Sequence, residues 1–293
     1  MNKVKILLDS ACDLTKELLE RYDLDYVPMM VLLNEVQYVA SLSWDNISPK
    51  ELYSMMRDGI RPYTSQVNEL DYERKFREYL NQGFDIVYIA VTSGLSASIN
   101  AAYKVKEVLV KEYPNQKINI VDSLVGDMGQ GLMGIYAAEL RDEGKDADQI
   151  SEMLEKEKFN FHQCGTVDDL KYLKNAGRVS GPAAFFANLF GIKPILISDL
   201  EGKNLAFKKV KGRKASIEFM ADYVKDHIKD PETHYISIIN ADCYEDALLF
   251  KEEILKRVPN TKGVLISDCG WIIGASAGPT TLNVYFYGVK RTQ

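Results

Sequence analysis

Short apolar runs alternate with amphipathic segments along the first half of the chain. Residues 4–8, 85–91 and 118–121 are apolar runs with the length of a buried strand. Segments 15–22 and 96–112 repeat their apolar residues every three or four positions, as a helix with one buried face does. Strands separated by helices predict a parallel sheet covered by helices on both faces.

The pattern changes near residue 160. Segments 193–199 and 205–210 are apolar runs joined by the turn Glu-Gly-Lys, which predicts a β-hairpin. Helical segments and three further strands follow, the last of them at 281–288. We therefore expect a two-domain α/β protein. A three-layer domain with a parallel sheet would span residues 1–160, and an α/β domain with a mixed sheet would span residues 161–293.

Two local motifs predict helix ends. Ser48, Pro49 and Glu51 form a helix start, with the hydroxyl as the N-cap, proline in the first turn and the glutamate three residues after the cap. Gly177 follows an amphipathic segment, where a glycine commonly ends a helix.

Composition narrows the classes of function. The 293 residues carry a net charge of −6, which argues against nucleic acid as the main partner. The longest nearly apolar run, 26–33, is far shorter than the roughly 20 residues of a membrane helix, and the amino terminus reads as a strand rather than a signal peptide. We expect a cytoplasmic protein without stable membrane insertion. The four cysteines are widely spaced, so we expect reduced thiols, no metal and no cofactor.

Small polar residues follow the predicted strands of the first half. In an open parallel sheet, ligands bind at the carboxyl ends of the strands, so these residues should meet at one rim. A further hydroxyl-rich stretch, Tyr-Thr-Ser-Gln at 63–66, precedes a predicted helix. The residues after the strands are Asp9, Ser10 and Asp13, then Thr92, Ser93, Ser96 and Ser98, then Asp122 and Ser123.

The stretch around Ser96 has three interpretations. Ser93 or Ser96 could cap the following helix. The free N–H groups of that helix start, together with the hydroxyls, could instead hold a carboxylate or a phosphate. Gly94–Ser98 also nearly fits the nucleophile elbow Gly-x-Ser-x-Gly, with Ser96 as the nucleophile of a serine hydrolase. Ser98 replaces the second glycine, and no histidine lies in an obvious triad position.

The acidic residues at the same rim raise a further possibility. Asp9, Asp13 and Asp122 could together bind magnesium, because carboxylates at strand ends are typical ligands of that ion. An Asp-Ser sequence after a strand is also a common turn and N-cap sequence, and we favour this structural role.

The stretch after Gly177 combines a charged and an apolar segment. Arg178 lies in a predicted loop, and residues 182–190 form a predicted helix that is apolar nearly all round. Such a helix is buried or lines an apolar cavity.

Five ordered motifs resemble the DegV family, the bacterial fatty-acid-binding proteins, over essentially the whole chain. The motif Thr-Ser-Gln is present without change, and the others are similar to the family's patterns. The motifs are ILLDSACDL at 6–14, TSQ at 64–66, TSGLSAS at 92–98, VDDLKYLKNAGRVSG at 167–181 and GWIIGASAGPTTLNVYFYG, similar to a glycine-rich closing strand, at 270–288.

The resemblance implies that one long-chain fatty acid is buried between two domains. It implies no catalytic residue and no cofactor, and in some members the bound acyl chain is presented to a separate fatty acid kinase. Arg178 would then lie near the entrance and face that partner. The implied carboxylate site consists of Thr64, Ser65, Ser93, Ser96 and Ser276, and the candidates for the acyl pocket are Met29, Met30, Leu32, Phe185, Phe186 and Leu189.

The sequence also departs from the family pattern. Many members have a histidine in the closing segment, where this chain has Ser276. Ala97 and Ser98 replace a glycine and a threonine, and Ala176 replaces the first glycine of a Gly-Gly-Arg motif. These changes leave acyl binding as the expected function, with kinase presentation as a narrower form of it and a serine hydrolase as the alternative. Another amphiphilic acid or a phosphorylated lipid could replace the fatty acid.

Overall fold

The computed structural model describes residues 3–181 and 191–292. Its first sheet is fully parallel, with strand order β2-β1-β6-β7. Every residue of the two central strands is buried, which agrees with their apolar sequences. The parallel sheet predicted for the first half is thus confirmed. Its strands are β1 (Val4–Asp9), β2 (Leu24–Val27), β6 (Asp85–Ala90) and β7 (Ile118–Asp122).

A second, mixed sheet is built from the second half of the chain, in the order β10-β9-β8-β13-β11-β12. Only β11 and β12 pair in parallel; the other neighbours are antiparallel. The predicted hairpin is confirmed as β9 and β10. The strands are β8 (Phe161–Thr166), β9 (Ile192–Ser198), β10 (Asn204–Lys211), β11 (Ile236–Asn240), β12 (Val264–Asp268) and β13 (Leu282–Tyr287).

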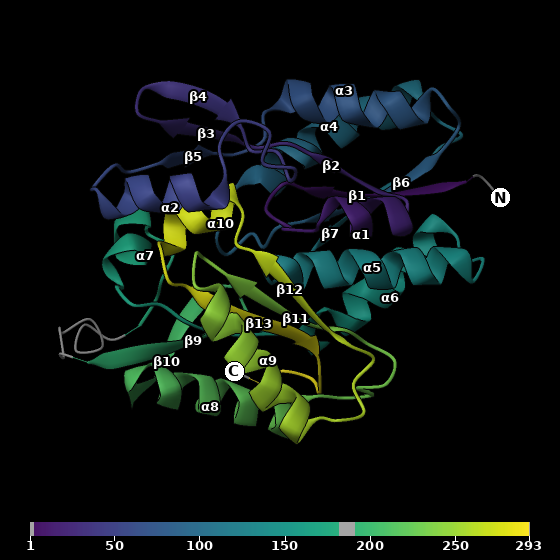
Figure 1. The fold of residues 1–293 in the computed structure, drawn as a ribbon. Coiled ribbons are helices and arrows are strands. Elements are labelled where there is room, and N and C mark those ends of the chain that lie inside the picture. The colour runs from purple at the N-terminus through teal and green to yellow at the C-terminus, as the bar shows by residue number, and fades with distance from the viewer. Residues whose placement is uncertain (1–2, 182–190, 293) are drawn as a thin grey trace.

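The helices separate the two sheets and cover their outer faces (Figure 1). Helices α3 and α4 pack on one side of the parallel sheet, α5 and α6 on the other, and α5 also contacts the mixed sheet. Helices α8 and α9 cover the far face of the mixed sheet. The helices are α1 (Lys16–Arg21), α3 (Glu69–Leu80), α4 (Ser98–Glu112), α5 (Met128–Asp142), α6 (Ala147–Glu157), α8 (Gly212–His227) and α9 (Tyr244–Arg257), with a 3-10 turn η1 at Lys158–Asn160.

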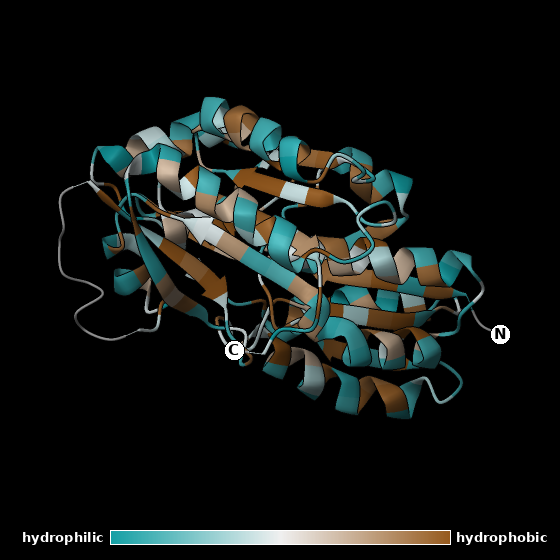
Figure 2. Cartoon of the chain, turned by 90° about the horizontal axis from the view of Figure 1, so that it is seen from below, coloured by the Kyte–Doolittle hydropathy of each residue, from teal (hydrophilic) through white to brown (hydrophobic). Residues whose placement is uncertain are grey.

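The hydropathy of the residues matches this layered arrangement of buried sheets and covering helices. The strands are largely apolar, whereas the helices carry hydrophilic residues over much of their surface (Figure 2). Among the described residues, no helix is both long and apolar enough to cross a membrane. The division into domains at residue 160 stays a prediction; it coincides with the change from the parallel to the mixed sheet.

A small antiparallel sheet, which the sequence did not predict, lies beside the parallel one. Strand β3 (Met30–Leu33) pairs with β4 (Val36–Val39) on one side and with β5 (Tyr63–Ser65) on the other. Helix α2 (Pro49–Arg57) lies between β4 and β5 in the chain, and its start is a complete capping box formed by Ser48 and Glu51, as predicted.

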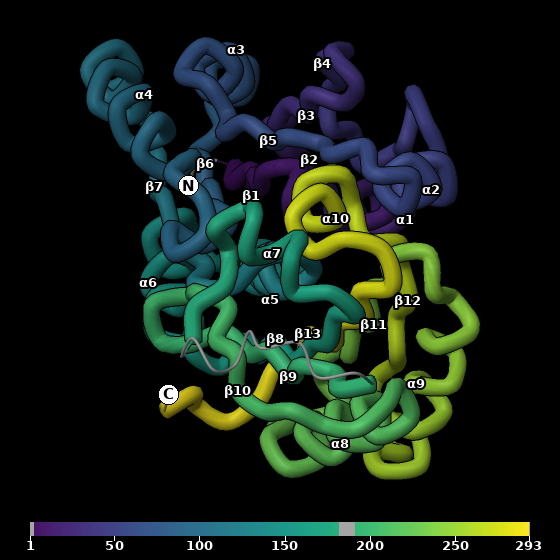
Figure 3. Tube along the Cα trace, turned by 90° about the vertical axis from the view of Figure 1, so that its left-hand side faces the viewer, coloured from purple at the N-terminus to yellow at the C-terminus, as the bar shows by residue number. Residues whose placement is uncertain are grey.

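Two short helices lie side by side at the edge of the molecule where the halves meet (Figure 3). Helix α7 (Lys171–Ala176) ends as predicted at Gly177, which has the left-handed φ of 68°. Helix α10 (Trp271–Ala277) corrects an expectation, because the segment resembling a closing strand is helical in its first part and forms a strand only from Leu282.

Aromatic packing holds α10 against the first half of the chain. The Trp271 ring stacks on Tyr38 and Trp44, with ring centroids 5.6 and 5.4 Å away. The Tyr53 hydroxyl donates to the Cys269 carbonyl at 2.5 Å, just before the helix. The C-terminal helix α10 is therefore part of the core of the first half.

Candidate ligand-binding cavity

A cavity of about 1000 Å³, open solvent at its mouth included, lies where the two halves meet. Its walls combine the loop after β6, the end of β5, the start of α5, helices α7 and α10, and strands of the mixed sheet. The ends of parallel strands thus face one side of the cavity, as expected for this sheet type. The lining residues are Met29, Thr64, Ser65, Gln66, Val91, Leu95, Ser96, Ala97, Gly126, Asp127, Gln163, Val167, Leu173, Arg178, Leu196, Asn204, Ile272, Ile273, Ser276, Ala277, Thr281, Asn283 and Tyr285.

The loop after β6 brings Ser96 to the cavity wall. Helix α4 begins at Ser98, two residues later than predicted, and its N-cap Ala97 makes no side-chain hydrogen bond. The Ser96 hydroxyl instead donates to Ser98 Oγ at 3.0 Å and accepts from the Ser98 N–H at 3.3 Å. Ser98 Oγ also accepts from the Val67 N–H at 3.2 Å, which ties this loop to the segment after β5.

Three further hydroxyls line the same cavity from other elements. Thr64 and Ser65 are exposed on β5, and Ser276 is half-buried on α10. Within residues 3–181 and 191–292, these side chains make no hydrogen bond to another residue. Their hydroxyls are therefore available to a ligand. Ser93 differs: it is exposed, it is not a lining residue, and its N–H donates to Asp122 Oδ1 at 3.1 Å.

Arg178 lines the cavity and is also exposed to solvent. Its Nε donates to the Leu95 carbonyl at 3.2 Å, and its Nη1 donates to the Ala176 carbonyl. The guanidinium is thus held beside the loop that carries Ser96, with donors left over. Among the described lining residues it is the only cation.

The expected acyl-pocket residues are distributed unevenly. Met29 is buried and lines the cavity, whereas Met30 and Leu32 do not, and Leu32 is 45% exposed on the small sheet. Phe185, Phe186 and Leu189 lie outside the described residues. The apolar part of the described wall comes instead from residues that the sequence did not single out: Val91, Leu95, Leu173, Leu196, Ile272 and Ile273.

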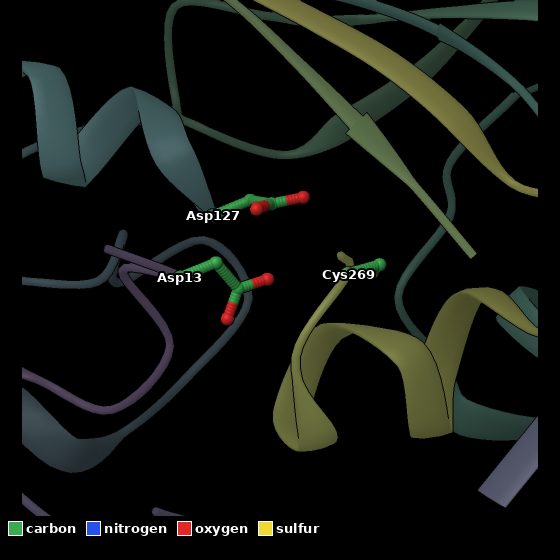
Figure 4. A group of neighbouring side chains, drawn as sticks. All are labelled: Asp13, Asp127 and Cys269. Atoms are coloured by element: carbon green, nitrogen blue, oxygen red, sulfur yellow. The ribbon is translucent and has the colours of Figure 1, made fainter. Parts of the chain in front are cut away.

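A buried acidic pair, Asp13 and Asp127, lies beside Cys269 (Figure 4), and Asp127 also lines the cavity. Asp13, Asp127 and Cys269 each place a potential ligand atom within 4.8 Å of the other two, and all three residues are buried. Asp13 Oδ2 accepts from the Gly270 N–H at 2.7 Å, and Asp127 Oδ2 accepts from the Tyr285 hydroxyl at 2.9 Å. The pair therefore connects loops of the first half to α10 and β13.

Burial and mutual repulsion favour the protonated forms of this pair. Desolvation raises the pKa of the Asp13 carboxyl well above its usual range, and the neighbouring Asp127 raises it further. Desolvation also raises the pKa of Asp127, although several hydrogen bonds oppose this. Such a pair is most stable when one proton is held between the two carboxyl groups.

The three acidic residues considered for magnesium do not gather. Asp9 is buried and accepts from the Ala11 and Val91 N–H groups at 3.1 and 2.9 Å. Asp122 Oδ1 accepts from the N–H of Leu124, two residues further along its own turn, at 3.2 Å, and from the N–H of Ser93 in the loop after β6 at 3.1 Å. These are the turn-stabilising roles that we favoured. Among the described residues, Asp13 groups with Asp127 rather than with Asp9 or Asp122.

No histidine reaches Ser96. All three histidines are described, and none lines the cavity. His162 Nε2 contacts the Val289 carbonyl at 2.6 Å, His227 contacts the Tyr223 carbonyl, and His234 packs on Tyr287. The arrangement therefore lacks the base that a serine hydrolase of the classical type requires.

The chain is similar to known proteins along nearly its whole length. A family model described as "Uncharacterised protein, DegV family" matches residues 3–288. The chain belongs to the DegV family. A DegV domain-containing protein of Clostridium perfringens is 36% identical over 288 residues, covering 98% of each chain. One from Streptococcus pyogenes serotype M1 is 32% identical over 283 residues, covering 97% of each.

Solved DegV structures have the same fold. A fatty-acid-binding DegV family protein from Thermus thermophilus matches with a TM-score of 0.87 and 25% identity, over 99% of this chain and all of that one. A stearic-acid-binding protein from Eubacterium ventriosum matches with a TM-score of 0.81 and 25% identity, over 97% of each chain. The two-sheet α/β architecture of this chain is thus that of its family.

Proposed function

We propose that this DegV protein binds a long-chain fatty acid in the cavity between its two halves. The observation that carries the proposal is the combination, in one cavity, of an arginine and hydroxyls that are unpaired in the described part of the chain with a buried apolar wall. An amphiphilic acid requires both kinds of surface. The solved relatives from Thermus thermophilus and Eubacterium ventriosum, described as fatty-acid-binding, support the same ligand class.

The head group would lie against Thr64, Ser65, Ser96 and Ser276. A carboxylate removed from water needs several hydrogen bonds, because an unpaired buried charge is costly. Hydroxyls donate to it without adding charge, and Arg178 supplies the positive charge nearby. Three of the four hydroxyls, those of Thr64, Ser65 and Ser276, have no hydrogen-bond partner within residues 3–181 and 191–292, which supports this assignment, since each can donate to the ligand without breaking a bond seen there.

The tail would lie against the apolar wall formed by Met29, Leu173, Ile272 and their neighbours. Each buried methylene contributes about 0.8 kcal/mol, so ten methylenes contribute about 8 kcal/mol before ordering costs. A long chain is therefore expected to bind more tightly than a short one with the same head group.

The test uses delipidated protein titrated with stearate by calorimetry. Thr64→Ala and Ser96→Ala together should weaken binding at least tenfold, because the carboxylate loses two donors. Ser54→Ala removes an exposed hydroxyl from α2 and serves as the matched control, with unchanged affinity. Saturable binding of a phosphorylated lipid with no binding of C14 to C18 fatty acids would replace the ligand class, and no saturable binding at all would refute the proposal.

We also propose that the bound acid is presented to a separate fatty acid kinase. Arg178 supports this because it lines the cavity and is exposed, so a partner can contact it while the ligand is bound. Presentation is tested by mixing the fatty-acid-loaded protein with a fatty acid kinase and ATP and measuring the acyl-phosphate that forms. Ser276→His, which introduces the histidine that many relatives are expected to have, should raise the rate. Absence of acyl-phosphate with both proteins would refute presentation without affecting fatty-acid binding.

A further inference from the structure

One wall of the cavity is polar although it is buried. Gln163 on β8, Asn204 on β10 and Asn283 on β13 are only 6, 7 and 5% exposed, and all three line the cavity. They belong to the face of the mixed sheet that is turned toward the first half. A cavity that held only a saturated chain would gain from leucine or valine at such positions, since an amide against methylenes gains no hydrogen bond.

The side-chain amides form a chain of hydrogen bonds along this wall. The Ser198 hydroxyl donates to Gln163 Oε1 at 3.0 Å, and Gln163 Nε2 donates to Asn204 Oδ1 at 2.9 Å. Asn204 Nδ2 then donates to the carbonyl of Arg178 at 2.9 Å. Since the Arg178 side chain donates to Leu95, this row continues to the loop that carries Ser96.

These amides keep unused hydrogen-bonding capacity. A side-chain amide has two N–H donors and an oxygen that accepts twice. Among the described residues, the bonds above employ one N–H of Gln163 and one acceptor position of Asn204 Oδ1. One donor and one acceptor therefore remain on adjacent side chains. A hydroxyl can both accept from the first and donate to the second.

We propose that the acyl ligand carries a hydroxyl group on its chain, bound by Gln163 and Asn204. The inference rests on the proposed function and narrows its ligand from fatty acids in general to hydroxylated ones. A methylene in the same place displaces water from the amides and returns no hydrogen bond. In a wholly apolar tunnel a hydroxylated chain would bind more weakly than a saturated one, because its hydroxyl would lose its hydration without gaining a hydrogen bond.

The first experiment compares stearate with 3-, 10- and 12-hydroxystearate by calorimetry on delipidated wild-type protein. At least one isomer should bind as tightly as stearate or more tightly, and its position would locate the polar wall along the chain. The inference is overturned if stearate binds and every hydroxylated isomer binds more weakly. Failure of all four acids to bind would instead refute the proposed fatty-acid function.

The second experiment changes the wall. Gln163→Met keeps the length of the side chain and removes its hydrogen-bonding groups, so the preference for the best isomer over stearate should fall at least fivefold. The side-chain amide of Gln82 donates to the Glu78 carbonyl outside the cavity. Gln82→Met is therefore the matched control, and it should leave the ratio of the two affinities unchanged. An unchanged ratio in a folded Gln163→Met protein, verified by thermal unfolding, would overturn the assignment to this wall.

Discussion

Gly94→Ala should destabilise the protein at the contact between its two halves. Gly94 lies in the loop that carries Ser96, and it faces the turn between β9 and β10. A Cβ at this position would be 2.4 Å from the Glu201 carbonyl oxygen and 2.8 Å from the Gly202 carbonyl carbon. On the other side, a Cβ on Gly202 would be 2.0 Å from Thr92 Oγ1. The two segments therefore approach so closely that neither glycine leaves room for a Cβ.

The magnitude follows from this geometry. Real Cβ atoms essentially never come closer than 3.0 Å to such neighbours, so the contact must open by about 0.6 Å. The obstructing atoms are backbone, so no side chain can rotate away. Inserting a methyl group into a packed contact costs about 1–3 kcal/mol. For a chain of 293 residues, an unfolding entropy of about 2.1 cal/mol/K per residue makes 1 kcal/mol correspond to roughly 1.6 °C in Tm, so a decrease of about 2–5 °C is expected.

The assay is thermal unfolding followed by circular dichroism, with Gly126→Ala as the matched control. Gly126 also lines the cavity, but a Cβ there would have its nearest neighbours at 3.8 Å, which is an ordinary contact. That variant should keep its Tm within about 1 °C, since no atom has to move. A wild-type Tm in Gly94→Ala, or an equal decrease in both variants, would refute the argument that this close backbone approach requires glycine.

Three further predictions test other parts of the structure. The folded-state pKa of Asp13 is raised, so this carboxyl contributes stability that is complete below its unfolded pKa of 3.8 and is lost as the pH rises through its folded pKa. Asp13→Asn should therefore gain stability relative to wild type between pH 5 and pH 8, by about 1.4 kcal/mol for each unit of pKa difference. A difference in the free energy of urea unfolding that stays constant across this range would contradict the prediction. Trp271→Ala should cost about 3–5 kcal/mol in the same assay and should also weaken stearate binding, because α10 carries Ser276; a stable variant with normal affinity would contradict the role of the ring stack. Ser93→Ala should bind stearate with an affinity within twofold of wild type, because Ser93 does not line the cavity. A tenfold loss of affinity in calorimetry would show that Ser93 belongs to the binding site after all.

Local sequence signals predicted much of the fold because they act over a few residues. The capping box at Ser48 and the glycine end of α7 depend only on neighbouring side chains, and both are present. The two central strands of the parallel sheet are mostly apolar and buried along their whole length, because helices cover both faces. The antiparallel hairpin of β9 and β10 follows from two apolar runs and a short turn. In each case, the residues that determine the element are adjacent in the chain.

Elements determined by distant contacts were missed. Strand β8, with the sequence FHQCGT, contains His162, Gln163 and Gly165 and so lacks a typical strand pattern. Its geometry becomes intelligible only beside β13, where Asn283 fills the space left by Gly165: a Cβ on that glycine would lie 1.9 Å from Asn283 Oδ1. Similarly, α10 is helical in a glycine-containing segment because Trp271 is packed by aromatic residues from the first half.

The same distinction explains which part of the candidate site could be predicted. Thr64, Ser65, Ser96 and Arg178 lie in motifs that stand out in the sequence, and all of them line the cavity. The amides of the opposite wall come one at a time from three separate strands, so no local pattern marks them. A head-group site built from loops can thus be found by motif, whereas the surface that selects the tail depends on strand pairing across the mixed sheet. Differences in ligand preference within such a family are therefore expected to arise from single residues of the sheet, such as Gln163, rather than from the motifs that define membership.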